Sequence, residues 1–193
     1  TGARWDDDWD DEQCVKGYWY SLTVPERSIG RVKSFYGNFG VLVRAYTYIR
    51  SLGAAGLREA TEMAVLNANY LQSILKEKYP LPYDRPCMHE CVVQGIVSGA
   101  EGVRALDIAK RMIDYGVHPP TNYFPLIVAE ALMFEPTETE SKASVDDLAE
   151  IMMRIADEAR EDPELLHQAP TKAPLRRLDE VKAARNPVLR WEG

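Results

Sequence analysis

The sequence lacks three features that would assign it to a well-defined class of protein: an excess of positive charge, a long apolar run and a large set of cysteines. Its formal net charge is −7 at pH 7, and binding to nucleic acid phosphates needs a basic surface, so we expect no nucleic-acid partner. Its apolar runs are far shorter than the ~20 residues that cross a bilayer, so we expect no membrane association. Three cysteines make a disulfide framework improbable and favour a reducing compartment, the cytoplasm or, in a eukaryote, the mitochondrial matrix.

Several catalytic motifs are also absent. The chain contains no G-x-S-x-G, and no glycine-rich phosphate loop precedes a predicted helix. The segment C-M-H-E-C at 87–91 contains residue types that bind zinc. However, three ligands on one face of a single strand stand about 6.5 Å apart per step of two residues, which is too wide for one tetrahedral ion. We therefore predict no metal site, and interpret the two cysteines as buried thiols and His89 as bonded locally.

What the sequence does contain is a regular order of apolar segments. Apolar residues make up 46% of the 193 residues, enough for one domain with its own core. Hydrophobic periodicity predicts helices at 29–52, 57–78, 103–115 and 138–160, strands at 87–97 and 126–134, and a short helix that begins at Pro163. Gly53 is expected to end the first helix in the left-handed conformation, and Gly116 to end the third. This order indicates an α+β fold, a short sheet with helices packed on one face.

The first 27 residues differ from the rest and are predicted to form a separate acidic and aromatic arm, followed by one domain at 28–193. The run W-D-D-D-W-D-D-E at 5–12 places six acids around two tryptophans. Such a run is usually a solvated tail, but exposed tryptophans also mark docking surfaces, so both interpretations stand. Residues 17–24 have the composition of a strand. Because the chain begins with Thr1 instead of methionine, we expect it to be processed or part of a longer protein.

The stretch 115–142 carries the densest polar pattern. Prolines at 119 and 120 exclude helix, so His118 to Thr121 is expected to be a loop. The apolar run at 126–134 predicts a buried strand. Thr137 and Glu140 have the spacing of a capping box, and together with Glu135 and Glu138 they are interpreted as the cap of the next helix, not as catalysts. Polar clusters thus lie at both ends of one predicted strand.

At this point the sequence resembles a known family. H-P-P-T-N-Y-F-P at 118–125 and E-P-T-E-T-E-S-K at 135–142 are similar to the C-terminal part of the glycine-cleavage P-protein, glycine dehydrogenase (decarboxylating), in its subunit 2-like form. S-F-Y-G-N-F-G at 34–40, A-V-L-N-A-N-Y-L at 64–71 and A-L-D-I-A-K-R-M-I-D-Y-G at 105–116 are similar too. The resemblance covers 28–191 in the same order throughout. It implies the small C-terminal domain of a fold-type-I enzyme that uses pyridoxal phosphate (PLP).

The resemblance also shows what the chain does not contain. An enzyme of this type needs a lysine that holds PLP and a phosphate cup of backbone N–H groups. The family carries this lysine in a His-Lys-Thr context before a glycine-rich run, and this chain has neither. Its eight lysines lie outside such a context: Lys16, Lys33, Lys76, Lys78, Lys110, Lys142, Lys172 and Lys182. We therefore expect PLP to come with a lysine-bearing partner, not to be bound covalently here, and the chain alone to be inactive.

The remaining role is a contribution to the wall of the active site. In such enzymes the small domain closes over the cofactor and supplies substrate contacts, which makes His118 and Thr121 the candidate substrate-binding residues. A turn whose polar groups bond the nearby backbone explains them equally well. Tyr36 and Asn38 are candidate cofactor-binding or interface residues. No residue of this chain is predicted to be catalytic. Arg176 and Arg177 could bind a carboxylate or a partner, but a solvated tail is the simpler interpretation.

The resemblance gives two hypotheses of different class. In the first, the chain is the C-terminal domain or a split subunit of glycine dehydrogenase. It would complete the PLP site for glycine decarboxylation and for aminomethyl transfer to the lipoylated H-protein, and its partners would be that protein and the lysine-bearing remainder. In the second, the domain is a non-catalytic structural or interaction subunit of a larger assembly. An N-terminal arm that is ordered and buried against another protein would favour the second hypothesis.

Overall fold

The computed structural model describes residues 2–4, 14–15, 18–21, 24–30 and 32–191. Contacts between residues divide the chain into two units, Thr1–Tyr48 and Ile49–Gly193, each described here by itself. Within the described residues, no helix combines the length and the apolar character needed to cross a membrane.

The first unit contains a small antiparallel sheet with the strand order β1-β3-β2. Its strands are β1 (Gly2–Arg4), β2 (Cys14–Val15) and β3 (Tyr18–Ser21). The last of these confirms the strand predicted within 17–24. The acidic tryptophan run at 5–12 lies outside the described residues, so both interpretations of the arm stay predictions.

The helix α1 (Phe39–Leu75) takes the place of the two helices predicted at 29–52 and 57–78. Its backbone is interrupted at Gly53, where φ is 63° and ψ is −174°. The break therefore falls at the predicted residue, but the extended ψ is not that of a left-handed helical stop. The predicted start at residue 29 was wrong, because Gly30 and Gly37 both adopt positive φ, which is incompatible with a helix interior.

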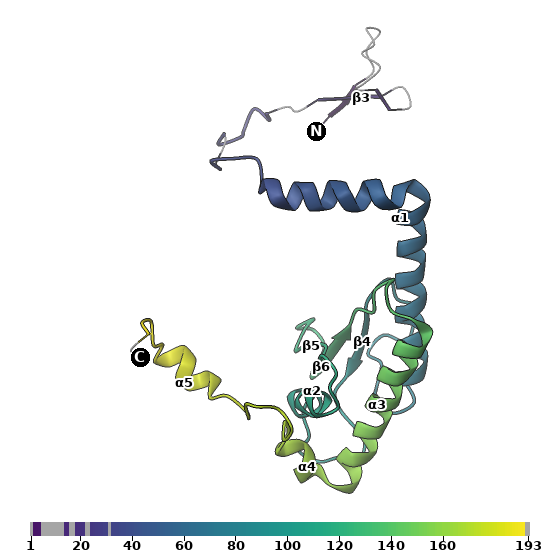
Figure 1. Cartoon of the computed structure of the whole chain (residues 1–193), viewed down its shortest axis with the longest axis vertical. Helices are drawn as coiled ribbons and strands as arrows, with labels where there is room; N and C mark the ends of the chain where they lie inside the picture. The colour runs from purple at the N-terminus through teal and green to yellow at the C-terminus, as the bar shows by residue number, and fades with distance from the viewer. Residues whose placement is uncertain (1, 5–13, 16–17, 22–23, 31, 192–193) are drawn as a thin grey trace. The chain divides into compact units, whose positions relative to one another are not determined.

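The second unit is built on a three-stranded antiparallel sheet with the order β4-β6-β5 (Figure 1). Its strands are β4 (Cys91–Gln94), β5 (Thr121–Asn122) and β6 (Ala131–Phe134). The register pairs Cys91 with Phe134 and Thr121 with Met133. The helices of this unit are α2 (Ala105–Asp114), α3 (Lys142–Glu161), α4 (Pro163–His167) and α5 (Glu180–Arg185).

The hydrophobic core lies between the helices and one face of this sheet. Val93 and Leu132 form a cross-strand pair and have no exposed surface. Fully buried side chains from α1, α2, α3 and α4 belong to the same cluster: Leu71, Leu75, Ile108, Met112, Met152, Ile155 and Leu166. Val92 and Met133, which point to the other face, are only half-buried. This confirms the predicted α+β fold with helices on one face of a short sheet.

Both strands are shorter than the sequence predicts. The run 126–134 contributes only its last four residues, and Leu126 and Ile127 are 87% and 79% exposed. The Val128 N–H donates to the Pro125 carbonyl at 3.0 Å and Glu130 has a φ of 51°, so a turn occupies the first half of the run. Likewise, only residues 91–94 of the strand predicted at 87–97 pair with a neighbour.

The predicted capping box at Thr137 and Glu140 was also wrong. The Asn67 side-chain amide of α1 donates to the carbonyl oxygens of both residues, at 3.0 and 3.1 Å, and holds them in a turn. The helix α3 begins later, at Lys142, and the Ser141 hydroxyl accepts the Ser144 N–H at 3.1 Å. The cap therefore moves to Ser141, because the preceding backbone is engaged by another element.

Ionic contacts join α2 to α3. The Arg111 guanidinium binds the Glu158 carboxylate through two hydrogen bonds of 2.8 and 2.9 Å, and Tyr115 donates to the same carboxylate. Arg111 also reaches the Asp114 carboxylate at 3.3 Å. Arg111 and Asp114 are both buried. We name these four residues, Arg111, Asp114, Tyr115 and Glu158, the ionic seam.

The segment after α4 is held against α2. The backbone N–H groups of Thr171 and Lys172 donate to the Asp114 carboxylate at 2.6 and 2.7 Å. Further along, the Arg177 guanidinium binds the Asp107 carboxylate at 2.7 Å and donates to the Ala169 and Leu166 carbonyls. For Arg177 the solvated-tail interpretation was thus wrong, and the alternative that it binds a carboxylate is confirmed.

Candidate functional site

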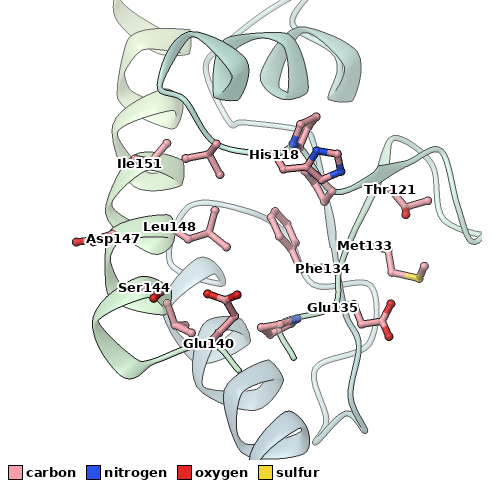
Figure 2. Close-up of a pocket in the computed structure, with 15 residues that line it drawn as sticks. His118, Thr121, Met133, Phe134, Glu135, Glu140, Ser144, Asp147, Leu148 and Ile151 are labelled. Carbon is pink, nitrogen blue, oxygen red and sulfur yellow. The ribbon is translucent and has the colours of Figure 1, made fainter. Parts of the chain in front are cut away.

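A cavity of about 580 Å³ opens beside the C-terminal end of β6. One wall is the loop that leads into β5, and the opposite wall is the first half of α3 (Figure 2). The loop cannot be helical because it contains two consecutive prolines, and α3 begins where the Ser141 hydroxyl caps it. The cavity therefore lies where the loop, the end of a strand and the start of a helix meet.

Both residues predicted to bind substrate, His118 and Thr121, line this cavity. His118 comes from the proline loop and Thr121 from β5, and both side chains are exposed. Figure 2 shows them on the same side of the cavity, across from the α3 side chains Leu148 and Ile151. The fold thus brings the two predicted residues to one site, and their role in binding substrate stays a prediction.

The polar lining is acidic. It includes Glu135, Glu140, Asp147 and Ser144, but no lysine or arginine. In Figure 2 the Glu140 carboxylate points toward the cavity, whereas the Asp147 carboxylate points away from it on the outer side of α3. Apolar side chains such as Phe134, Leu148 and Ile151 form the rest of the wall. A small ligand that carries an amine or a hydrogen-bond acceptor suits this mixture, whereas a phosphate group needs cationic or N–H donors.

Three lining residues escaped the sequence analysis. Ser144 and Asp147 lie one turn apart on the first half of α3, and a signal was available for them, since both adjoin inward-facing apolar positions of that helix. Glu140 was assigned to a helix cap. In the structure its backbone carbonyl is held by Asn67, and its side chain borders the cavity.

The two candidate cofactor-binding residues belong to the first unit. Tyr36 is exposed, and the Lys33 ammonium lies 4.9 Å from the centroid of its ring. The Asn38 carbonyl accepts the Leu42 N–H at 3.1 Å, which places Asn38 immediately before α1. Their role in cofactor binding stays a prediction.

Two of the motifs that carry the family resemblance have structural roles in the second unit. In the motif at 64–71, Asn67 holds the 137–140 turn, and Asn69 exchanges hydrogen bonds with the backbone of Cys87, at 2.7 and 2.9 Å. In the motif at 105–116, the Asp107 carboxylate accepts the Arg104 N–H at the start of α2. Asn67 thus fixes the turn that borders the cavity at Glu140, without lining the cavity itself.

Comparison with known proteins identifies the family. The family model described as "Glycine dehydrogenase, C-terminal domain" matches residues 60–176. The chain belongs to this family. The match includes every element from the C-terminal part of α1 to α4, and so the whole cavity.

Individual relatives agree with this assignment. The probable glycine dehydrogenase (decarboxylating) subunit 2 of Caldanaerobacter subterraneus subsp. tengcongensis is 61% identical over 164 residues, which are 85% of this chain and 34% of that protein. The protein of the same name from Thermotoga maritima is 56% identical over 178 residues, 92% of this chain and 38% of that protein. The chain thus spans roughly a third of the length of the curated relatives it matches.

Among solved structures, an inhibitor-bound crystal structure of glycine decarboxylase (P-protein) of the glycine cleavage system aligns with 56% of this chain and 24% of its own. The sequence identity is 21% and the TM-score 0.48.

Proposed function

We propose that this glycine dehydrogenase domain forms one wall of the active site of a glycine dehydrogenase (decarboxylating) subunit 2 in the glycine cleavage system. The observation that carries the proposal is that His118 and Thr121 meet at one cavity within the family-matched region. The names of the relatives, glycine dehydrogenase (decarboxylating) subunit 2, support the reaction. The rest of the active site would belong to the two thirds of those relatives that this chain does not span.

The cavity by itself does not fit PLP. Its lining contains no lysine or arginine, whereas a phosphate group needs cationic or N–H donors. We therefore assign the phosphate cup and the cofactor lysine to a lysine-bearing remainder or partner subunit. When bound there, PLP supplies the electron sink that decarboxylation of an amino acid requires.

The residues of this chain would bind and orient the substrate. Glycine presents a carboxylate and an amine, and the His118 imidazole and the Thr121 hydroxyl can each donate a hydrogen bond to a carboxylate oxygen. The apolar wall of Phe134, Leu148 and Ile151 would exclude water around them, which strengthens such hydrogen bonds. Tyr36 and Asn38 are proposed to contact the cofactor in the assembled enzyme.

The proposed partners are the lysine-bearing remainder or subunit and the lipoylated H-protein, which accepts the aminomethyl group. The proposed compartment is the cytoplasm, or the mitochondrial matrix if the source is a eukaryote. The net charge of −7 agrees with partners other than nucleic acid.

Reconstitution tests the proposal. The chain is mixed with the upstream remainder of a subunit 2 relative and with its partner subunit, and CO₂ release from glycine is measured with lipoylated H-protein. We expect activity only in the mixture. His118→Ala and Thr121→Val should each lower kcat/KM by about tenfold or more, since each removes a substrate hydrogen bond worth about 1.5–3 kcal/mol to a charged group.

The matched control is Glu161→Ala, an exposed position at the end of α3 that should leave the reconstituted activity unchanged. Full activity in both cavity variants would contradict the assignment of the site. Absence of activity with every lysine-bearing partner would contradict the proposal as a whole. Tyr36→Phe and Asn38→Ala should weaken PLP binding by the reconstituted enzyme, measured by absorbance.

A second experiment tests whether PLP is held covalently by this chain or by the lysine-bearing partner. The purified chain is titrated with PLP, reduced with borohydride and weighed by intact mass spectrometry. We expect no stoichiometric adduct, because the lysines of this chain lie outside a cofactor-binding context. A single adduct on one lysine would show that this chain carries the covalent cofactor site.

A further inference from the structure

A second group of side chains lies at the corner of the sheet where β4 begins and β6 ends. His89 and Glu90 directly precede β4, and Glu135 directly follows β6. The antiparallel pair Cys91 and Phe134 fixes the register at this point. Because side chains alternate along a strand, Glu90 and Glu135, one residue beyond this pair, lie on the same face of the sheet.

The geometry of this group is compact. The His89 Nε2 atom lies 3.7 Å from a Glu90 carboxylate oxygen and 3.9 Å from a Glu135 carboxylate oxygen. All three ligand atoms lie within 4.8 Å of one another. In a tetrahedral zinc site, ligand atoms about 2.0–2.1 Å from the ion are roughly 3.4 Å apart. The three side chains are partly or fully exposed, so side-chain rotations that shift these atoms by about 1 Å would bring them to that spacing.

The charges in this group are unbalanced. Two carboxylates face each other across neighbouring strands, an arrangement that destabilises a sheet when nothing lies between them. In the described part of the chain, no lysine or arginine forms an ion pair with Glu90 or Glu135, and the only basic side chain beside them is His89. A cation bound between the two carboxylates would turn this repulsion into attraction.

We propose that His89, Glu90 and Glu135 form a binding site for a divalent cation of borderline hardness, with Zn²⁺ as the preferred ion. One imidazole nitrogen and two carboxylate oxygens are a ligand set that zinc accepts, and three protein ligands leave a fourth position for water or another ligand. The family-based proposal of the preceding section assigns no metal to this chain, and the site is independent of it.

This ligand set differs from the one that the sequence analysis rejected. Cys91 is fully buried in the core, so its thiol points away from the group and does not complete it. The third ligand, Glu135, comes instead from the end of the neighbouring strand β6. The sequence pattern at 87–91 therefore does not indicate it. Three ligands on one strand would still stand too far apart for one ion. In this group the pairing of β4 with β6 brings in the third ligand from the neighbouring strand.

Glu135 connects this site with the cavity, because it also belongs to the cavity lining. In Figure 2 its carboxylate points away from α3. A bound cation would therefore hold this side chain at the edge of the cavity and neutralise its carboxylate.

Calorimetric titration of the chelator-treated 193-residue chain with ZnCl₂ tests the proposal. We expect one tight site per chain. His89→Ala, Glu90→Gln and Glu135→Gln should each weaken it by more than about tenfold, because loss of a second-shell partner alone costs about 10–100-fold. Visible absorption of the Co²⁺ form should show a single four- or five-coordinate species that disappears in His89→Ala.

Controls separate this site from other zinc binding. The six acids at 6–12 offer weak sites that all three variants retain. His118→Ala removes an exposed histidine of the cavity and should leave the tight site intact. No tight site in the unmodified chain, or a tight site that survives His89→Ala, would overturn the proposal. Circular dichroism of the metal-free variants shows that they are folded, because the substituted side chains lie at the surface.

Discussion

The helix α3 has two differently constructed flanks. Toward α2 it contributes Glu158 to the ionic seam, where each charge meets an opposite charge and buried groups are hydrogen-bonded. Toward the proline loop its first half borders a cavity whose lining contains no lysine or arginine. Charged groups whose hydrogen bonds are all made within the protein stabilise the fold. Polar groups that still have unused donors or acceptors are available to bind a ligand. The same helix thus supplies a structural face and a candidate binding face.

The largest expected effect comes from breaking the seam. Arg111→Ala leaves Asp114 and Glu158 without their cationic partner, in surroundings from which water is largely excluded. Loss of one partner of a buried ion pair costs about 3–5 kcal/mol. Urea denaturation should show that loss, whereas Arg58→Ala, which breaks an exposed pair with Glu62 on α1, should cost about 0–1 kcal/mol. Equal effects of the two variants would contradict the contrast between seam and surface.

The ionic seam should also make the free energy of unfolding depend on pH in the acidic range. Burial works against the ionised form of Asp114, but hydrogen bonds from the Lys172 and Thr171 N–H groups, the Thr171 hydroxyl and Arg111 outweigh it and hold its pKa below the ordinary value. A carboxyl whose pKa is lower in the folded than in the unfolded chain stabilises the folded state, and this contribution is present in full at pH values above the unfolded pKa. That contribution disappears as the pH falls through the folded pKa.

Urea midpoints measured from about pH 6 to about pH 3 should therefore fall toward acid. Asp114→Asn should be less stable at neutral pH by about 1–3 kcal/mol, since it weakens hydrogen bonds to a charged acceptor. It should also show a shallower fall between these pH values. An unchanged slope in this variant would assign the acid sensitivity to other carboxylates.

A smaller effect is expected at the start of α3. Ser141→Ala removes the hydroxyl that caps the helix and should cost about 1 kcal/mol. Thr137→Ala changes the residue that the sequence pattern favours as the cap. Its hydroxyl contacts only the exposed Thr139 hydroxyl, so it should cost clearly less. The reverse ranking in thermal denaturation would restore the capping box predicted from the sequence.

The smallest effect on stability is expected in the cavity. Asp147→Asn and Glu140→Gln remove the negative charges of exposed side chains at the cavity, and should change the free energy of unfolding by less than about 0.5 kcal/mol. A loss as large as that of Arg111→Ala would show that the cavity wall is part of the structural framework, and would weaken its assignment as a binding face.

The sequence predicted best what depends on local periodicity. The stripes of α2 and α3 and the glycine stop at Gly116, whose φ is 78°, follow from residues within a few turns of one another. The strand ends and the helix cap failed because they depend on distant partners. Asn67 holds the 137–140 turn across 70 residues of sequence, and no local pattern indicates that contact.

The candidate site divides in the same way. His118 and Thr121 were identified from one polar loop, and the cavity contains both. The contribution of Glu140 and Ser144 to the opposite wall could not be predicted, because it depends on where α3 begins. The proposed cation site of His89, Glu90 and Glu135 could not be predicted from the sequence for a similar reason. Its third ligand is placed only by the pairing of Cys91 with Phe134.

The contacts that Asp114 and Asp107 make with the segment at 171–177 also have a practical meaning for anyone who shortens, fuses or transplants this domain. They set its C-terminal limit at Arg177, since no residue beyond it is buried among those described. A gene that stops shortly after this arginine should still yield a folded product, whereas one that stops before Pro170 discards the segment that closes the domain. Fusion partners and affinity tags therefore belong beyond residue 178.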